Sequence, residues 1–213
     1  MSVSTENNTS ADTRHRLLLA AGDVFAERGY RAATIREIVE KAGANIAAVN
    51  YHFGDKEALY TAVLSFVCEG AEAFARGVGE EADAPEEELH LFVRGFLERC
   101  LGANGMSWRG RLMAREMSEP TPAMKTLVDR VMQPTSERLV RLVRDACPAL
   151  TDQEAWLCAL SIIGQCTHHM HSEAIISRLD APIPRGPNAI DALAAHITRF
   201  SLAAVRNYSD TRV

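Results

Sequence analysis

The spacing of apolar and polar residues predicts helices along nearly the whole chain and favours no strand. From Thr13 onward, apolar residues recur at positions i, i+4, i+7 and i+8, which is typical of one buried helix face. They are Leu17, Ala21, Val24 and Phe25. Gly29 stands where a glycine commonly ends a helix. Residues 1–12 are polar and precede this pattern, so we expect them to form a disordered lead.

Two short helices with a sharp break between them come next. Thr34-Ile35-Arg36-Glu37 is a capping box, in which the threonine oxygen and Glu37 satisfy backbone amides at the start of a helix. The predicted buried side of this helix is Ile35, Ile38, Val39 and Ala42. Ala42-Gly43-Ala44 breaks the chain, and Asn45 can cap a further helix over 46–53.

The helix over 46–53 has one apolar side and one slim polar side. Val49 and Phe53, with Ile46 nearby, are predicted to anchor it inward. The opposite side combines small residues with amide, phenol and imidazole groups; these are Ala47, Ala48 and Tyr51, flanked by Asn50 and His52, and the capping Asn45 is a further candidate to bind DNA. Such a narrow face suits the major groove of B-DNA, which is only about 12 Å wide. The two helices together therefore predict a helix-turn-helix that binds double-stranded DNA.

The rest of the chain continues as helices. Gly54 ends the short helix, and Asp55 caps the next. Further helical patterns cover 55–67, 85–101, 108–117, 122–146, 151–179 and 188–208. Asn104-Gly105 is predicted to be a turn, and Pro134 to kink or divide its helix. The predicted fold is all-α with about nine helices, comprising a DNA-binding domain over 13–60 and a helical effector-binding and dimerisation domain over 61–213.

Composition narrows the class of protein. The 47% apolar fraction is normal for a packed protein, and five cysteines without a CxxC pair indicate reduced thiols. No run of 18 apolar residues and no signal peptide is present, so we expect a cytoplasmic protein without a membrane partner. The net charge is −5, yet residues 13–56 carry seven Lys or Arg against five Asp or Glu. This local balance permits DNA binding near the N-terminus.

Three side chains are placed to bind phosphates, whose contacts set the position of the protein on DNA. They are Thr34 and Arg36 at the start of the second helix and Lys56 at the start of the fourth. Each has a plainer alternative. Thr34 can act only as a cap, Arg36 can pair with Glu40, and Lys56 can be a solvated charge. Likewise, Tyr51 and His52 can pack under the fourth helix.

The run Ala33–Leu64, with AGANIAAVNYHFGDKEALY at its centre, resembles the TetR (tetracycline-repressor-like) family of bacterial transcription regulators. NIAAVNYHF is most similar to the CecR-like branch. The resemblance implies a repressor in which DNA-contacting positions fall on Thr34, Arg36, Ala48, Asn50, Tyr51, His52 and Lys56. The sequence departs from many members at Ala48, where they have threonine, and at Asn50, where they have tyrosine.

A reading helix of two turns covers few bases, so we expect two copies on an inverted repeat. Apolar residues of the last helix follow 3,4,3,4 spacing, typical of a packed seam. They are Ile190, Leu193, Ile197, Phe200 and Ala204, with Leu157, Leu160, Gly164 and Ile175 as candidates on a partner helix. The family resemblance implies a homodimer through a four-helix bundle. The alternative is that this stripe only meets its own core.

Methionine, cysteine and histidine are concentrated in the middle of the chain. The tentative effector-binding residues are Met113, Glu116, Met117, Cys166 and His169. Glu116 can instead pair with a neighbouring arginine. His168 and His171 share a helix face, but two histidines lack the further ligands of a closed zinc site, so we expect no metal. No cofactor is expected.

By resemblance, a small-molecule effector of unknown identity shifts the dimer to a form mis-spaced for its operator. The alternative is a DNA-binding protein controlled by a protein partner without such an inducer. An enzyme is not expected, because no phosphate loop, nucleophile elbow or HExxH motif is present. A Cys166–His169 dyad is the one catalytic alternative.

Overall fold

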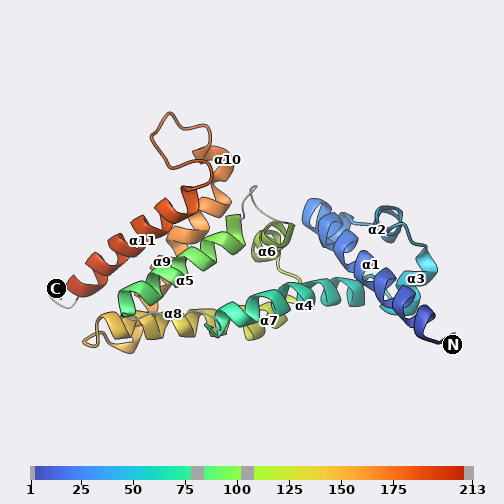
Figure 1. Ribbon diagram of the computed structural model, residues 1–213, viewed down its shortest axis with the longest axis horizontal. Coiled ribbons are helices and arrows are strands. Elements are labelled where there is room, and N and C mark those ends of the chain that lie inside the picture. Colours follow the sequence, from blue (N-terminus) through green and yellow to red (C-terminus); the bar gives the residue numbers. More distant parts are fainter. Residues whose placement is uncertain (1–2, 78–83, 102–107, 209–213) are drawn as a thin grey trace. The chain divides into compact units, whose positions relative to one another are not determined.

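The computed structural model describes residues 3–77, 84–101 and 108–208, and within these ranges it is helical without a strand (Figure 1). The helices are α1 (Val3–Ala32), α2 (Ile35–Ala42), α3 (Ile46–His52), α4 (Lys56–Ala75), α5 (Pro85–Leu101), α6 (Trp108–Ser118), α7 (Met124–Leu127), α8 (Gln133–Ala146), α9 (Asp152–His171), α10 (Glu173–Ile176) and α11 (Ala189–Asn207). A π-helical turn, Val128–Met132, joins α7 to α8. The all-α prediction is confirmed, and the helix predicted over 151–179 is divided into α9 and the short α10. The predicted Asn104-Gly105 turn lies outside the described residues.

The first helix is longer than the sequence pattern predicts. α1 begins at Val3, so the expectation that residues 1–12 are disordered is wrong for 3–12. No proline or glycine interrupts this stretch, and the helix simply continues toward the N-terminus. Gly29 does end the regular helix, because its backbone is non-helical, with φ 79° and ψ 164°. A positive φ of this kind favours glycine.

The chain divides into two compact units, and the division differs from the expected one. The first unit contains residues 1–70 together with 108–128, and the second contains 71–107 together with 129–213. In this division α6 lies with the N-terminal helices, whereas the sequence pattern predicts a single boundary after residue 60. The reason is a tertiary contact: the Trp108 ring of α6 fills the space over Gly22 of α1.

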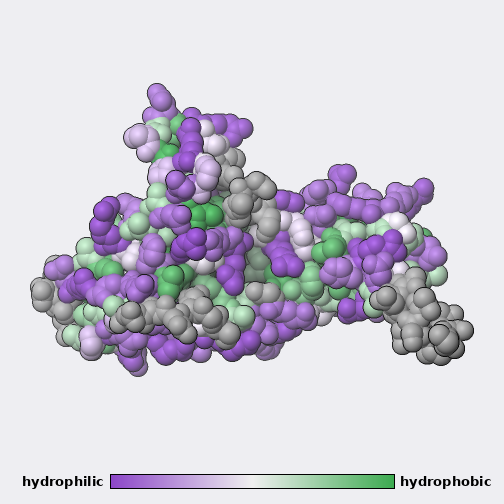
Figure 2. Space-filling view, in the orientation of Figure 1, coloured by the Kyte–Doolittle hydropathy of each residue, from purple (hydrophilic) through white to green (hydrophobic). Residues whose placement is uncertain are grey.

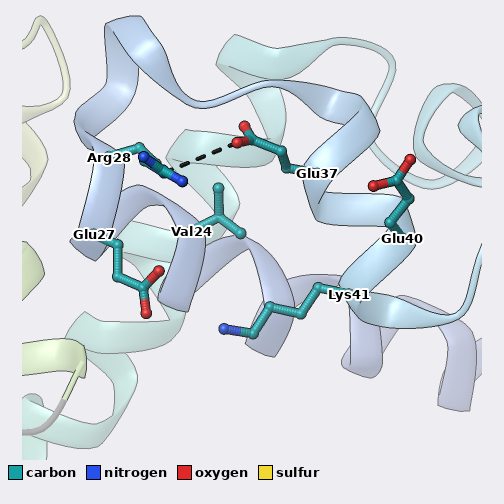
Figure 3. Close-up of a pocket in the computed structure, with 6 residues that line it drawn as sticks. All are labelled: Val24, Glu27, Arg28, Glu37, Glu40 and Lys41. Carbon is teal, nitrogen blue, oxygen red and sulfur yellow. Dashed lines mark ion pairs between the residues drawn. The ribbon is translucent and has the colours of Figure 1, made fainter.

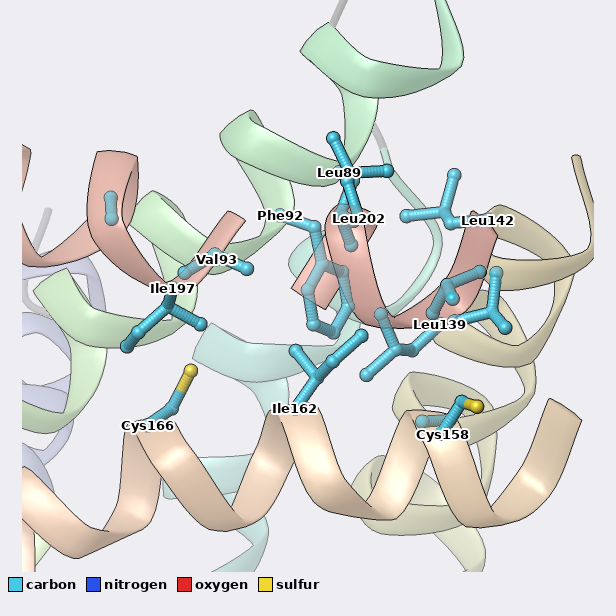
Figure 4. Close-up of a cluster of buried hydrophobic side chains, with 14 of the residues drawn as sticks. Leu89, Phe92, Val93, Leu139, Leu142, Cys158, Ile162, Cys166, Ile197 and Leu202 are labelled. Atoms are coloured by element: carbon cyan, nitrogen blue, oxygen red, sulfur yellow. The ribbon is translucent and has the colours of Figure 1, made fainter. Parts of the chain in front are cut away.

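The second unit has its core between α5, α8, α9 and α11. Figure 4 shows Phe92, Ile162 and Ile197 pointing into this cluster from three different helices. All three are at most 1% exposed. Polar contacts at the edges hold the same helices: Arg94 of α5 donates to Asp191 of α11 at 2.7 Å. Burial of this apolar surface is the main source of stability for the unit.

Pro134 lies in the first turn of α8, directly after the π-helical turn. Proline lacks the amide hydrogen of a regular helix and clashes with the carbonyl four residues earlier. A π-helical turn is a common way to accommodate such a disruption without ending the helix. The prediction that Pro134 disturbs its helix is thus confirmed, as a local change of winding.

Hydrophilic side chains cover most of the face seen in Figure 2, with hydrophobic residues in small groups between them. Within the described residues, no helix combines the length and apolar character needed to cross a bilayer.

Candidate nucleic-acid interface

The start of α2 is fixed by the predicted capping box. The Thr34 hydroxyl accepts a hydrogen bond from the Glu37 amide at 3.2 Å, and Glu37 accepts one from the Thr34 amide at 3.0 Å. The Thr34 hydroxyl also donates to the Glu37 carboxylate at 2.9 Å, and this bond, followed by the one from the Thr34 amide, lowers the pKa of the Glu37 carboxyl. Arg36 is exposed and donates to Glu40 at 2.9 Å, so the predicted alternative pairing is present. This hydrogen bond to Glu40 raises the pKa of Arg36.

Two ion pairs hold α2 against α1. Figure 3 shows the groove between the two helices, with Arg28 directed toward Glu37 across it. The Arg28 Nε to Glu37 Oε1 distance is 3.9 Å, and Lys41 Nζ lies 3.1 Å from Asp23 Oδ2. Such exposed pairs contribute about 0–1 kcal/mol each. Both ion pairs connect α1 to α2.

The turn into α3 follows the predicted pattern. Gly43 has φ 60° and ψ 41°, a left-handed conformation that caps α2. Asn45 is exposed and caps α3 by accepting a hydrogen bond from the Ala48 amide at 2.9 Å. Val49 is 1% exposed and is the one fully buried residue of α3. The helix is thus held by a cap and a single apolar anchor.

Ile46 is 53% exposed, so its predicted role as an inward anchor is wrong. It is the first residue of a seven-residue helix, and neighbouring helices cover α3 only around Val49. Helical periodicity places Ile46 on the same side as Val49. However, the helix is too short for neighbouring helices to cover that side at both of its ends.

The outward side of α3 presents the predicted groups. Tyr51 is 80% exposed, Asn50 and Ala47 are exposed, and Ala48 is half-buried. The alternative that Tyr51 packs under α4 is therefore wrong. His52 is half-buried with its ring edge-on to Tyr51, at 4.9 Å between centroids, and 6.1 Å from the Phe53 ring. The three rings form a row along the end of α3.

Lys56 is held within the first unit. Its ammonium donates to the Arg31 carbonyl at 3.2 Å and lies 4.9 Å from the centroid of the Tyr30 ring. The alternative of a purely solvated charge is thus incorrect. Asp55 caps α4 as predicted, accepting from the Ala58 amide at 2.8 Å.

The predicted seam on α11 splits between two faces. Leu193 and Ile197 are 8% and 1% exposed and belong to the core of the second unit, as the alternative interpretation held for this stripe. Ile190 is half-buried against that core. In contrast, Phe200 is 60% exposed, and Ala204 is exposed. Seven-residue spacing cannot separate these faces, because both lie within one broad stripe.

The predicted partner positions on α9 are also outside the core. Leu157 is 49% exposed, Leu160 is 52% exposed, and Gly164 is exposed. Gln165 of α9 donates to Ser201 of α11 at 3.2 Å, so these two helices are neighbours. Ile175 lies in α10 and is 64% exposed.

Glu116 has a structural role in the first unit. It is 1% exposed and accepts hydrogen bonds from the Tyr60 hydroxyl at 2.5 Å and from the Thr121 amide at 2.8 Å. Burial, followed by the contact with Glu116, raises the pKa of Tyr60. The alternative pairing with an arginine is wrong, since Arg115 pairs with Glu119. Its oxygens bind α4 and the chain after α6, and a role for Glu116 in effector binding stays a prediction.

The other four predicted effector residues lie in two different units. Met113 and Met117 are on α6 of the first unit, half-buried and 45% exposed respectively. Cys166 and His169 are on α9 of the second. Figure 4 shows Cys166 directed into the apolar core, and it is 1% exposed. Burial raises its pKa to about 12, which leaves the thiol protonated and argues against a Cys166–His169 dyad.

Three histidines lie near the end of α9. His168 is exposed, and its ring lies 5.8 Å from that of His169. Burial, together with His168 and His196, lowers the pKa of His169. Among the described residues, no group of three or more His, Cys, Asp or Glu is arranged to hold a metal ion.

Known families match both parts of the chain. Residues 17–63 match the profile of the tetR family of bacterial regulatory proteins. Residues 85–205, more than half of the chain, match the C-terminal domain of the HTH-type transcriptional dual regulator CecR. The chain therefore belongs to the TetR family of bacterial transcription regulators. Within that family, its C-terminal part is a CecR-type domain.

Individual relatives agree with this assignment. CecR of Shigella flexneri is 31% identical over 140 residues, which span 61% of this chain and 62% of CecR. A TetR-family transcriptional regulator from Streptomyces coelicolor has the same fold, with a TM-score of 0.68 at 16% identity over 92% of this chain and 96% of its own. AibR, solved in complex with isovaleryl coenzyme A and operator DNA, has a TM-score of 0.68 at 16% identity over 88% of this chain and 97% of its own. CecR and the Streptomyces coelicolor protein are both named as transcription regulators, and the matched part of this chain spans less than two thirds of CecR.

Proposed function

We propose that this protein is a repressor that binds an inverted-repeat operator as a homodimer and leaves it when a small-molecule effector binds. The observation that carries the proposal is the outward side of α3. Tyr51 is 80% exposed on a helix whose start is capped by Asn45 and whose inner side is held by Val49. A large phenol ring held in water on a fixed, slender helix is suited to base edges in the major groove.

Dimerisation is supported by apolar side chains that the second unit leaves exposed. Leu157, Leu160 and Phe200 are each about half exposed or more, on helices that lie next to each other. Gly164 and Ala204 are small residues on the same two helices, which allows close approach of a second copy. Two copies place two reading helices on one side of the DNA, matching a two-fold repeat.

Control by a small molecule is supported by relatives with this fold. AibR was solved with isovaleryl coenzyme A and operator DNA. An effector acts here by binding one arrangement of the dimer more tightly than the arrangement that fits the operator. The α4 helix passes from the first unit into the second, and as a continuous helix it is our proposed route for such a change.

One observation favours a second candidate, control by a protein partner. Two polar candidates for the effector site are engaged by the protein itself: Glu116 accepts hydrogen bonds from Tyr60 and Thr121, and Cys166 is buried. Titrating the protein–operator complex with extracts of small metabolites distinguishes the two. Release of DNA by a low-molecular-weight fraction supports the effector, and release only by a protein fraction supports the partner.

The test of DNA binding is selection of genomic fragments by the purified protein, followed by footprinting. We expect a protected site with two-fold symmetry and an affinity that falls steeply with salt. Tyr51→Ala should weaken binding to the selected site by about 1–3 kcal/mol per half-site and leave random DNA nearly unchanged. Tyr208→Ala is the matched control, since Tyr208 is a partly exposed tyrosine of the second unit. Equal affinity of Tyr51→Ala and wild type for the selected site would overturn the proposed reading face.

A further inference from the structure

The side chains predicted to bind phosphates are largely engaged inside the first unit. Arg36 donates to Glu40 at 2.9 Å, and Lys56 donates to the Arg31 carbonyl at 3.2 Å. The Thr34 hydroxyl belongs to the capping box. A helix lying in the major groove is flanked by two phosphate strands, so further cations close to α3 are needed to fix its position.

Arg14, on α1, is such a cation. It is exposed, and its guanidinium carbon lies 5.3 Å from the centroid of the Phe53 ring. Over the residues that the structure describes, it has no carboxylate within ion-pair distance. Arg16, two residues further along α1, differs in this respect: it pairs with Asp12 at 3.2 Å and donates to Thr13 at 3.3 Å.

The position of Arg14 is set by the end of the reading helix. Phe53 is the residue that caps α3 at its C-terminus and directly follows His52. The row of side chains therefore runs from Tyr51 through His52 and Phe53 to the Arg14 guanidinium. An arginine stacked on an aromatic ring keeps its planar donors directed outward at low entropic cost, and the partial negative charge at a helix C-terminus favours a cation there.

From this juxtaposition we infer that Arg14 binds a phosphate of the DNA backbone and sets how far α3 is inserted along the major groove. The inference rests on the proposed function and adds a residue, 39 positions before Phe53, that no pattern in the sequence connects with α3. The contact is to the backbone and is therefore independent of base sequence.

The experiment compares Arg14→Ala with Arg16→Ala, which remove the same charge from the same helix. Fluorescence anisotropy measures the affinity for two probes, a genomic fragment selected by the wild-type protein and a duplex of random sequence, over a series of salt concentrations. Losing one phosphate contact lowers the slope of log affinity against log salt by about 0.9, or about 1.8 for a dimer. We expect this change for Arg14→Ala on both probes and little change for Arg16→Ala.

Two further variants separate a phosphate contact from a loss of structure. Arg14→Lys keeps the charge without the stacked plane, and should keep the salt slope while binding less tightly. Phe53→Leu keeps an apolar cap and removes the ring that orients Arg14, and should resemble Arg14→Lys. Circular dichroism melting of each variant verifies that the fold is retained.

The outcomes separate the two proposals. If the wild-type protein binds neither probe at any salt concentration, DNA binding itself is refuted. If wild type binds with a steep slope and Arg14→Ala has the same slope as Arg16→Ala, the role of Arg14 is refuted while the proposed function stands.

Discussion

At the scale of single residues, the Glu116 side chain connects α4 to the chain segment after α6 within the first unit. Its buried carboxylate accepts from Tyr60 of α4, and from both the amide and the hydroxyl of Thr121. Three donors thus converge on one acidic side chain away from water. A buried donor that loses its acceptor costs more than the bond itself contributes, because the donor stays desolvated.

Replacing Glu116 by glutamine tests this role. Glu116→Gln keeps the shape but turns an amide toward groups that are themselves donors, and should lower the free energy of unfolding by about 1.5–3 kcal/mol. Urea denaturation followed by circular dichroism measures it. Glu119→Gln, whose side chain is 74% exposed, should change stability by less than about 0.5 kcal/mol. Equal stability of the two variants would contradict a structural role for Glu116.

At the scale of elements, the close packing of α1 and α6 decides which helices form the first unit. A Cβ atom at Gly22 would lie 2.4 Å from an atom of the Trp108 ring, far closer than van der Waals contact. Residue 22 is therefore glycine because the Trp108 ring leaves no room for a Cβ atom, and not because its backbone conformation requires glycine. A helix pattern predicts only that residue 22 is helical, where alanine would serve better by about 1 kcal/mol.

Gly22→Ala should consequently destabilise the protein, by about 1–3 kcal/mol, because the added methyl group displaces the ring. Thermal unfolding provides the measurement. The double variant Gly22→Ala with Trp108→Ala is the contrasting case: it should be no less stable than Trp108→Ala alone, because the ring that the added methyl group displaces is absent. A Gly22→Ala protein as stable as wild type would show that α6 does not pack on α1 as described.

At the scale of the whole molecule, the two flanks of α11 have different surroundings. Ala203 lines a groove with Glu86, Glu87 and His90 of α5. Ala204, the next residue, is exposed on the stripe that includes Phe200, four residues earlier. Only the second flank continues the exposed leucines of α9 in the proposed dimer interface.

This difference gives a matched pair for the oligomeric state. Ala204→Asp should place a charge in the proposed interface and convert the dimer to a monomer, since an unpaired charge is costly to bury. Ala203→Asp carries the same change and should remain dimeric. Light scattering coupled to size-exclusion chromatography distinguishes the two masses. If both variants were monomeric, or both were dimeric, the interface would not lie on the flank of α11 that we propose.

The sequence alone determined most of the helices from Thr13 onward, several of their caps and the family. The bounds predicted for 85–101, the capping box at Thr34 and the N-cap Asn45 depend on neighbours within a few residues, so local pattern suffices to find them. The exposed Tyr51 was also foreseen, because one anchored side of a short helix leaves the other outward.

What only the tertiary structure decided is which apolar and polar groups meet across long separations in the chain. The pattern could not tell buried Ile197 from exposed Phe200, or show that Glu116 bonds to Tyr60 and that Arg14 lies over Phe53. Helical periodicity fixes the direction of a side chain about its own helix axis. Whether another helix lies in that direction depends on packing between residues that are distant in the sequence, and periodicity carries no information about it.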